Sequence, residues 1–246
     1  MNNMPLSGKV AVVTGAGRGI GRAIALGYAR AGAAVCCSAR SIDEIEETAR
    51  CIVAAGGQAI SVCADVTDYA SVDALFATAA VAFGGVDIVV ASAGGSMENK
   101  SVEESDPLGW KHAIEVNLIG AYHTAKAAIP HLRRRGAGKM IFVGSGMGHR
   151  GAPTRSAYAA SKSGLWMLTR VLSQELVTLN ICVNELIPGP VRTAFIAGRE
   201  DAVRAATGAT EWMKEPEDVV PMALFLATQP DQGPTGQTFS LARREL

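Results

Sequence analysis

The sequence predicts a single α/β domain in which helices cover both faces of a parallel sheet. The chain has 246 residues, a length that one α/β domain commonly reaches. Hydrophobic residues make up 48% of it and charged residues 19%, so the chain can bury a large core and is not mainly disordered. Short apolar runs alternate with longer amphipathic stretches. This is the pattern of βαβ units, whose right-handed crossovers produce a doubly wound parallel sheet.

The first half of the chain predicts four strands and three helices. The first apolar run reads KVAVVT and ends at a glycine, which indicates a buried strand followed by a tight turn. The second helix has several Glu residues in its first turns, where the helix dipole favours negative charge, and two glycines end it. The expected elements are strands at 9–14, 34–38, 59–64 and 86–91 and helices at 19–31, 42–55 and 68–83.

The alternation continues after residue 91. A long helical pattern covers 107–135, with Gly120 and Pro130 as expected irregularities, whereas 188–215 has little periodicity. The expected elements are strands at 139–144, 181–187 and 238–241 and helices at 107–135, 158–179 and 216–228. Because no linker, low-complexity segment or repeat interrupts the pattern, the sequence predicts one domain over residues 1–246.

Charge and composition exclude several classes of protein. The 23 basic and 23 acidic residues balance, whereas proteins that bind nucleic acids or anionic membranes are usually basic. The five cysteines form no C-x-x-C pair and the four histidines show no zinc-like spacing with them, so we expect free thiols and no metal site. The N-terminus lacks the features of a signal peptide and no 18-residue apolar run occurs, so we expect a cytoplasmic protein without a membrane span.

A glycine-rich turn follows the first expected strand, where residues 14–21 read TGAGRGIG. Glycines let the backbone turn tightly and approach a ligand closely, and the next helix offers free N–H groups, which suits the pyrophosphate of a dinucleotide. The spacing is not G-x-G-x-x-G. The position after the first strand of a βαβ chain nevertheless favours dinucleotide binding over a purely structural turn.

The ends of the second and third expected strands supply further candidate contacts. An NAD site needs an acid at the end of the second strand to hold the ribose 2′-hydroxyl, but the sequence has Arg40 there and its first acid, Asp43, inside the next helix. Arg40, together with Arg18 from the glycine-rich turn, can pair with a 2′-phosphate, so we expect NADP(H), with NAD(H) as the alternative. After the third strand, Asp65 and Val66 are candidate adenine contacts.

Tyr158 and Lys162 stand four residues apart on one face of an expected helix. A tyrosine phenol titrates near pH 10, and a neighbouring ammonium lowers its pKa toward the range useful for proton transfer. Tyr122 and Lys126 have the same spacing, but they lie well inside the preceding helix, where a packing or surface role is expected. Tyr158 instead follows the fifth strand and a Gly/Pro-containing loop, which places it at the edge of the sheet where ligands bind.

Several motifs together resemble the short-chain dehydrogenase/reductase family. In chain order they are Thr14-Gly15, Gly19-Ile20-Gly21, Asp65-Val66, Ala93-Gly94, Asn117, Ser145, Tyr158 with Lys162, and Pro188-Gly189-Pro190. The resemblance covers nearly the whole chain, and the T-G-x-x-x-G-I-G turn combined with a serine thirteen residues before Y-x-x-x-K is specific. It implies a Rossmann-type sheet of seven strands in the order 3-2-1-4-5-6-7, hydride transfer with NAD(P), and homodimers or homotetramers.

The resemblance also implies roles for individual residues. Tyr158 resembles the proton donor in carbonyl reduction, Lys162 the residue that lowers the pKa of that tyrosine and binds the nicotinamide ribose, and Ser145 the hydroxyl that polarises the carbonyl. Asn117 resembles the asparagine that holds a water leading to the lysine. The expected cofactor contacts are Gly15, Gly17, Arg18, Gly19, Ile20, Arg40, Asp65, Val66, Ala93, Gly94, Tyr158, Lys162, Pro188, Gly189 and Thr193.

The sequence departs from the family pattern at two places. Ala91 stands where the family usually has an asparagine that braces neighbouring strands, which affects local stability more than chemistry. The C-terminus reads FSLARR where many members have V-D-G-G, so contacts between subunits are expected to differ there.

Three loops, 95–100, 146–155 and 191–215, are expected to surround the substrate. They contain apolar or positively charged side chains that could contact it: Phe195, Trp212, Met213, Arg150 and Arg155. For His149, a place in the pocket and a plain surface position both remain open.

We expect an NADPH-dependent carbonyl reductase or alcohol dehydrogenase that acts on a small molecule. A 3-oxoacyl-[acyl-carrier-protein] reductase is an alternative, although the segment GSMENKSVEES after Gly94 lacks the T-R-D motif of those reductases. A non-catalytic dinucleotide-binding scaffold is the second alternative, but such a protein has no need of the Ser-Tyr-Lys set.

The helices expected at 107–135 and 158–179 carry more apolar side chains than one sheet face needs. The residues expected to serve either an interface between subunits or the core are Ala121, Ala125, Ala128, Ile129, Leu165, Trp166, Met167 and Leu168.

Overall fold

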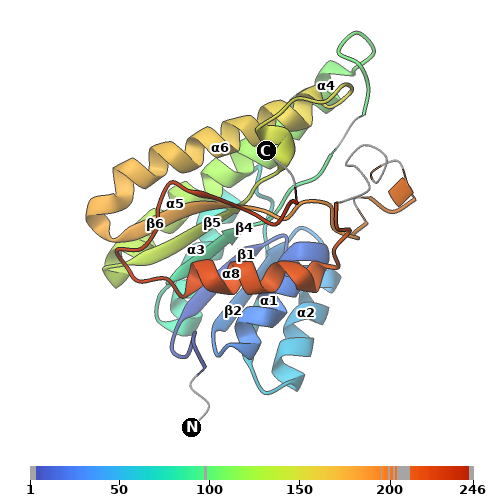
Figure 1. Cartoon of the computed structure of the whole chain (residues 1–246). Coiled ribbons are helices and arrows are strands. Elements are labelled where there is room, and N and C mark those ends of the chain that lie inside the picture. The colour runs from blue at the N-terminus through green and yellow to red at the C-terminus, as the bar shows by residue number, and fades with distance from the viewer. Residues whose placement is uncertain are drawn as a thin grey trace.

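A single parallel sheet forms the middle layer of the molecule (Figure 1). The computed structural model describes residues 4–96, 99–194, 196–198, 200–201, 203 and 211–243. The seven strands run in the order β3-β2-β1-β4-β5-β6-β7, and every neighbouring pair is parallel. They are β1 (Val10–Thr14), β2 (Ala34–Ala39), β3 (Gln58–Cys63), β4 (Ile88–Ala91), β5 (Gly138–Val143), β6 (Ile181–Ile187) and β7 (Thr238–Ser240). The fold class and the strand order are therefore confirmed.

Helices cover both faces of the sheet, and each face has its own core (Figure 1). One face carries α1 (Gly19–Arg30), α2 (Ile42–Ala54) and α8 (Val220–Ala227), and the other carries α3 (Tyr69–Phe83), α5 (Gly120–Arg135) and α6 (Ser156–Leu176). Side chains of β5 alternate between the two cores, because successive residues of a strand point to opposite faces: Met140 and Phe142 join one, and Ile141 and Val143 the other. Short 3₁₀ turns are η2 (Gly146–Gly148), η3 (Val177–Leu179) and η4 (Pro216–Val219).

The single helix expected at 107–135 is wrong in detail, since it consists of three parts. α4 (Pro107–Ile114) passes into a π-helical segment, η1 (Glu115–Ile119), before α5 begins at Gly120. A Cβ at Gly120 would lie 2.6 Å from Cγ2 of Val66, so the glycine allows this helix to approach the end of β3 closely. Pro130, the other expected irregularity, lies inside α5 without ending it.

The side chain of Thr14 braces the two central strands at their carboxyl ends. Its Oγ1 accepts hydrogen bonds from the amides of Ser92, at 3.2 Å, and Ala93, at 3.3 Å. The loop after β4 is thereby tied to β1 although Ala91 has no polar side chain. In the part of the chain that the structure describes, no helix is long and apolar enough to cross a membrane.

Candidate active site

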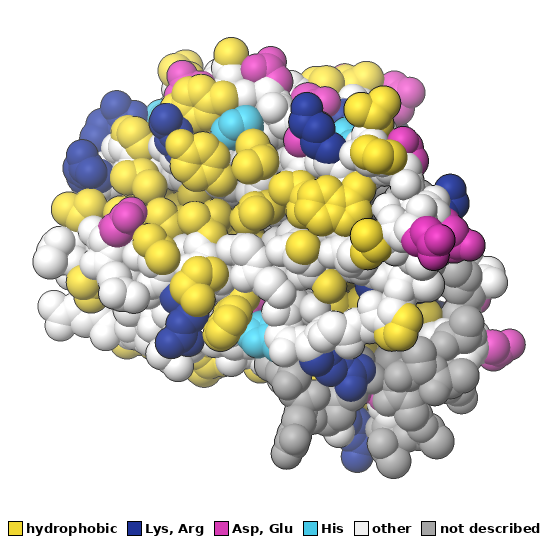
Figure 2. Space-filling model, turned by 90° about the horizontal axis from the view of Figure 1, so that it is seen from above, with side chains coloured by type: hydrophobic (Ala, Val, Ile, Leu, Met, Phe, Trp, Pro, Cys, Tyr) yellow, Lys and Arg dark blue, Asp and Glu magenta, His cyan; other side chains and the backbone are white. Residues whose placement is uncertain are grey.

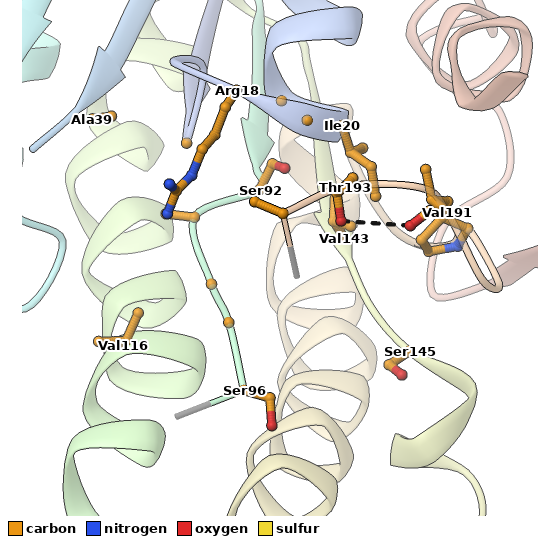
Figure 3. A pocket seen from close by; sticks show the side chains of 18 of the residues that line it. Arg18, Ile20, Ala39, Ser92, Ser96, Val116, Val143, Ser145, Val191 and Thr193 are labelled. Carbon is orange, nitrogen blue, oxygen red and sulfur yellow. Dashed lines mark hydrogen bonds between the residues drawn. The ribbon is translucent and has the colours of Figure 1, made fainter. Parts of the chain in front are cut away.

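A cavity of about 730 Å³ lies at the carboxyl edge of the sheet. In Figure 3, Arg18 and Ala39 lie toward one end of it and Ser145 toward the other. Every sequence-predicted site residue except Asn117 lines this cavity: Gly15, Gly17, Arg18, Gly19, Ile20, Arg40, Asp65, Val66, Ala93, Gly94, Ser145, Tyr158, Lys162, Pro188, Gly189 and Thr193. The topology thus gathers residues that lie far apart in the sequence.

The glycine-rich turn fits a dinucleotide pyrophosphate. Gly15 has a φ of 70°, and a Cβ on it would lie 2.9 Å from the backbone nitrogen of Ala93. A Cβ on Gly21 would lie 2.3 Å from the carbonyl oxygen of Gly15, so the turn closes only with glycine at both positions. α1 begins at Gly19 without a side-chain cap, and its first residues line the cavity. Its free amides can therefore receive phosphate oxygens.

Thr193 lies beside this turn in Figure 3. A Cβ on Gly19 would lie 3.1 Å from Cγ2 of Thr193, and the threonine hydroxyl is 3.5 Å from the carbonyl oxygen of Val191. The segment after β6 therefore reaches the glycine-rich turn across the cavity.

The end of the cavity near β2 is lined by both positively and negatively charged side chains. Arg18 and Arg40 line it, as predicted, and so does Glu44 from the first turn of α2. Nη1 of Arg18 lies 3.8 Å from Oε1 of Glu44, and the two side chains are 73% and 39% exposed. Such an exposed pair is weak, so Arg18 can exchange Glu44 for another anion. Glu44 is not predicted from the sequence, although it is an acid in the first turn of the helix that follows β2.

Asp65 occupies the end of β3 in a set of local hydrogen bonds. Its Oδ1 accepts from the Thr67 amide at 2.9 Å and from the Thr67 hydroxyl at 2.8 Å. Burial acts to raise the pKa of Asp65, but these hydrogen bonds and the positive charges of Arg40 and His112 outweigh it and lower the pKa below its ordinary value. The carboxylate can therefore accept a hydrogen bond from a ligand while it keeps its negative charge.

Ser145, Tyr158 and Lys162 meet at the other end of the cavity. Ser145 follows β5, and Tyr158 and Lys162 lie one turn apart near the start of α6. The Ser145 side chain hydrogen-bonds the Tyr158 phenol. Nζ of Lys162 is 5.8 Å from the centre of the Tyr158 ring and donates a 2.8 Å hydrogen bond to the carbonyl oxygen of Val143.

Burial shifts the pKa values of both residues on α6. It raises the pKa of Tyr158, against the opposing effects of the Ser145 hydrogen bond and the positive charge of Arg155. It also lowers the pKa of Lys162 to about 8, while the negative charge of Glu185 acts in the opposite direction. In this structure the Nζ of Lys162 donates its hydrogen bond to the carbonyl oxygen of Val143, while burial keeps the pKa of Tyr158 above its ordinary value.

Asn117 lies behind the cavity wall, in the π-helical segment. Its side-chain amide donates to the carbonyl oxygens of Gly95, at 2.8 Å, and Ala113, at 2.9 Å, and its Oδ1 accepts from the Gly95 amide at 3.0 Å. A Cβ on Gly94 would lie 2.6 Å from Oδ1 of Asn117 and 3.7 Å from Nζ of Lys162. Asn117 therefore fixes the loop after β4 directly behind the lysine. π-helical segments often occur at functional sites.

The expected substrate loops contribute unequally to the cavity. Arg155 lines it and donates to the side chains of Ser96, at 3.5 Å, and Asn99. Trp212 is described but does not line the cavity, and Met213 and Arg150 do not line it either. Phe195 lies outside the described residues.

His149 is in neither of the two expected places. Its side chain is 12% exposed and turns inward, with Nε2 2.9 Å from Oε2 of Glu185 on β6. The imidazole also lies against Trp166, with ring centres 4.9 Å apart. Glu185 is not predicted from the sequence, although it is a charged residue in the otherwise largely apolar run ICVNELI.

The chain is similar in sequence and in fold to known proteins. Residues 9–203 match the family model described as short chain dehydrogenase. A 3beta-hydroxysteroid dehydrogenase 1 of Eggerthella lenta is 39% identical over 244 residues, which cover 95% of this chain and 92% of that protein. A cis-4-hydroxycyclohexanecarboxylate dehydrogenase of Sinomonas cyclohexanicum is 37% identical over 225 residues, with 89% of each chain covered. A crystal structure of a short-chain type dehydrogenase/reductase from Mycobacterium marinum matches with a TM-score of 0.91 at 31% identity, over 97% of this chain and 96% of that one.

Proposed function

Because this chain belongs to the short-chain dehydrogenase/reductase family, we propose that it transfers a hydride between NADP(H) and a carbonyl or secondary alcohol of a small molecule. The observation that carries the proposal is the meeting of Ser145, Tyr158 and Lys162 at one end of a cavity whose other part is a glycine cradle. The glycine-rich turn, Arg18, Arg40 and Asp65 would hold the dinucleotide, which supplies or accepts the hydride when bound.

The residues at the end of β5 and on α6 have different roles at the substrate oxygen. In carbonyl reduction, Ser145 donates a hydrogen bond that polarises the carbonyl, and Tyr158 donates the proton that converts its oxygen to a hydroxyl. The hydrogen bond between the two side chains supports this shared role, because it brings their hydroxyl groups together. Lys162 holds a positive charge next to the phenol and stabilises the phenolate that remains. Asn117 keeps the loop behind Lys162 in place.

Two relatives point to the kind of alcohol. The names of the proteins from Eggerthella lenta and Sinomonas cyclohexanicum refer to a 3beta-hydroxysteroid and to a hydroxycyclohexanecarboxylate. In both, the hydroxyl group is on a carbon ring. We therefore propose a cyclic secondary alcohol or ketone as the first substrate class to test. The positive charge of Arg155 at the cavity wall suits a ring that carries a carboxylate.

The test is oxidation of NADPH in the presence of cyclic ketones, open-chain ketones and acetoacetyl thioesters. Tyr158→Phe should lower kcat by about 10²–10⁴-fold, the usual effect of removing a general acid, while NADPH still binds. Tyr122→Phe is the matched control, because its hydroxyl lies 3.5 Å from Lys126 on the exposed side of α5, and it should stay active. NADPH binding without turnover of any ketone would support the non-catalytic scaffold instead.

A further inference from the structure

Glu185 is a fully buried acid on the strand next to the active site. Ile181 and Val183 point from β6 into the core beneath α3, α5 and α6, and Glu185 follows them in the same alternation. Its Oε2 accepts a 2.8 Å hydrogen bond from the Thr238 hydroxyl and lies 2.9 Å from Nε2 of His149. Its Oε1 is buried and has no hydrogen-bond partner among the described residues. A carboxylate in such a place is costly unless nearby positive charge compensates it.

The carboxylate contacts both ends of the loop that carries Ser145. An ideal Cβ on Gly144 would lie 1.9 Å from Oε1 of Glu185, so the acid fills the space that a side chain at this position would need. At the other end, His149 bonds to Oε2 of the same group. Between them, the Ser163 hydroxyl donates a 2.6 Å hydrogen bond to the carbonyl oxygen of Gly148. The loop 144–149 is therefore held against β6 and α6 along its length.

Two ionisable groups face this acid in the described part of the chain. One is His149, in the segment after η2. The other is Lys162 on α6, whose pKa the negative charge of Glu185 acts to raise. From β7, the neighbouring strand, the contact is the uncharged hydroxyl of Thr238. Tyr158 in turn faces Lys162, whose Nζ is 5.8 Å from the centre of its ring. Nζ of Lys162 donates to the carbonyl oxygen of Val143, and Glu185 fills the space beside the next residue, Gly144, so the acid and the ammonium both lie against the segment 143–144.

We propose that Glu185 is a positioning residue of the active site: through His149 it fixes the loop that carries Ser145, and its negative charge supports the ammonium of Lys162. The role of Ser145 and Lys162 in this statement rests on the proposed function. The contacts of Glu185 do not, so the two ideas can fail separately.

The first experiment measures Lys162 directly in the enzyme without substrate. In protein labelled with ¹³C-lysine, the ¹³Cε signal that disappears in Lys162→Met is titrated in the wild type and in Glu185→Gln. The variant keeps the size of the side chain and an acceptor for Thr238 but removes the charge. The titration midpoint of Lys162 should fall by roughly one pH unit, the size expected for loss of one nearby opposite charge. An unchanged midpoint would overturn the electrostatic part of the proposal. This result would not depend on which substrate the enzyme uses.

The second experiment measures log(kcat/KM) against pH for ketone reduction. In Glu185→Gln the loss of activity at high pH should begin at lower pH than in the wild type, and kcat should fall because the Ser145 loop is less well fixed. The control is Thr238→Val, which removes the other hydrogen bond to Oε2 and keeps the charge. It should lower Tm without moving the pH profile. If Glu185→Gln also changes only Tm, Glu185 is an ordinary structural acid.

A further variant covers the case in which Glu185→Gln does not fold. Glu185→Met combined with His149→Leu replaces both partners by apolar side chains, a change that buried ion pairs often tolerate. The double variant should show the same lower Lys162 midpoint and a reduced kcat. A double variant with wild-type kcat and an unchanged Lys162 midpoint would refute both parts of the proposal.

Discussion

The buried ammonium of Lys162 affects the stability of the protein as well as its chemistry. Burial lowers the pKa of this group from its ordinary 10.5 to about 8, so the folded protein binds its proton less tightly than the unfolded chain does. Below pH 8 both states carry the proton, and the cost of the buried charge is fully present. Between pH 8 and 10.5 the unfolded chain keeps a proton that the folded chain has lost, so the contribution of Lys162 to stability rises with pH.

The first prediction isolates this effect. The free energy of unfolding of the wild type, minus that of Lys162→Met, should increase between about pH 8 and pH 10 in urea titrations. Taking the difference removes the opposite contributions of Tyr158 and Cys37, whose pKa values burial raises, that of Cys37 to about 12. A difference that stays flat over this range would mean that Lys162 is not buried as an ammonium.

The second prediction concerns cofactor preference. Arg40→Asp should lower kcat/KM for NADPH by roughly tenfold to a hundredfold, the worth of one charge-assisted hydrogen bond to a 2′-phosphate, and raise kcat/KM for NADH. The new carboxylate would repel the phosphate and accept the ribose hydroxyl instead.

Arg50→Asp is the matched control for that variant, because Arg50 pairs with Glu47 on α2 and does not line the cavity. It should leave the ratio of the two cofactors unchanged. A wild type that prefers NADH would refute the role of Arg40 and would favour Glu44 as the residue that contacts the ribose.

The positions of the strands can be predicted from the sequence, whereas the fine structure of one helix cannot. Strands buried on both faces of a parallel sheet form continuous apolar runs, which is why β1, β2, β5 and β6 could be located in the sequence to within one residue. The π-helical segment before α5 has no such signal, because it adds one residue to a turn without changing composition. It depends on contacts that form only in the fold, such as those of Asn117 with Gly95 and of Gly120 with Val66.

In the candidate site, too, some residues can be predicted from the sequence and others cannot. Glycines, the Tyr-Lys spacing and Ser145 have local patterns that could be recognised in the sequence. The inward turn of His149 could not be predicted, since it depends on Glu185, which is 36 residues away in the chain, on β6. Glu44 could not be predicted either, because its place in the site depends on how closely α2 approaches Gly17. A Cβ on Gly17 would lie 2.7 Å from the Cβ of Glu44.

The third prediction tests the junction of β1 and α1. Gly21→Ala would place its Cβ 2.3 Å from the carbonyl oxygen of Gly15, a backbone atom that cannot move without opening the turn. It should destabilise the protein by about 1–3 kcal/mol, the usual cost of overpacking, and weaken NADPH binding measured by calorimetry. Gly151→Ala is the control, because nothing lies within 4 Å of its Cβ position. Equal NADPH affinity for wild type and Gly21→Ala would show that this turn does not hold the phosphates.

Exposed apolar side chains lie on the face of the molecule that carries α5 and α6. Figure 2 looks down on the face that carries α6 and α5 and shows hydrophobic side chains in a band across it. Several residues expected at an interface belong to the core instead: Ala121, Ala125, Ala128 and Leu165. The apolar side chains of this region that are exposed are Ile119, Tyr122, Met167 and Val171. We propose that a second copy of the chain covers them.

The fourth prediction follows from that proposal. Wild-type protein should be a dimer or tetramer by light scattering at micromolar concentration, and Met167→Glu combined with Val171→Glu should convert it to a smaller species. Val81→Glu is the control, because Val81 is 88% exposed on α3 and is not among the four exposed side chains of the proposed interface. A monomeric wild type would rule out the interface.

The strand order also determines how the protein can fold as it leaves the ribosome. β1 lies between β2 and β4, so the strand made first has one edge unpaired until residues 88–91 emerge. At about 5–20 residues per second, that edge stays open for seconds and offers a template for wrong partners. Among the strands made before it, β5 pairs only with β4 and β6 only with β5, so the strands around the glycine-rich turn are complete before those that carry the loop with Ser145. A nascent chain that stalls after β4 would therefore contain the glycine-rich turn but lack Ser145, Tyr158 and Lys162.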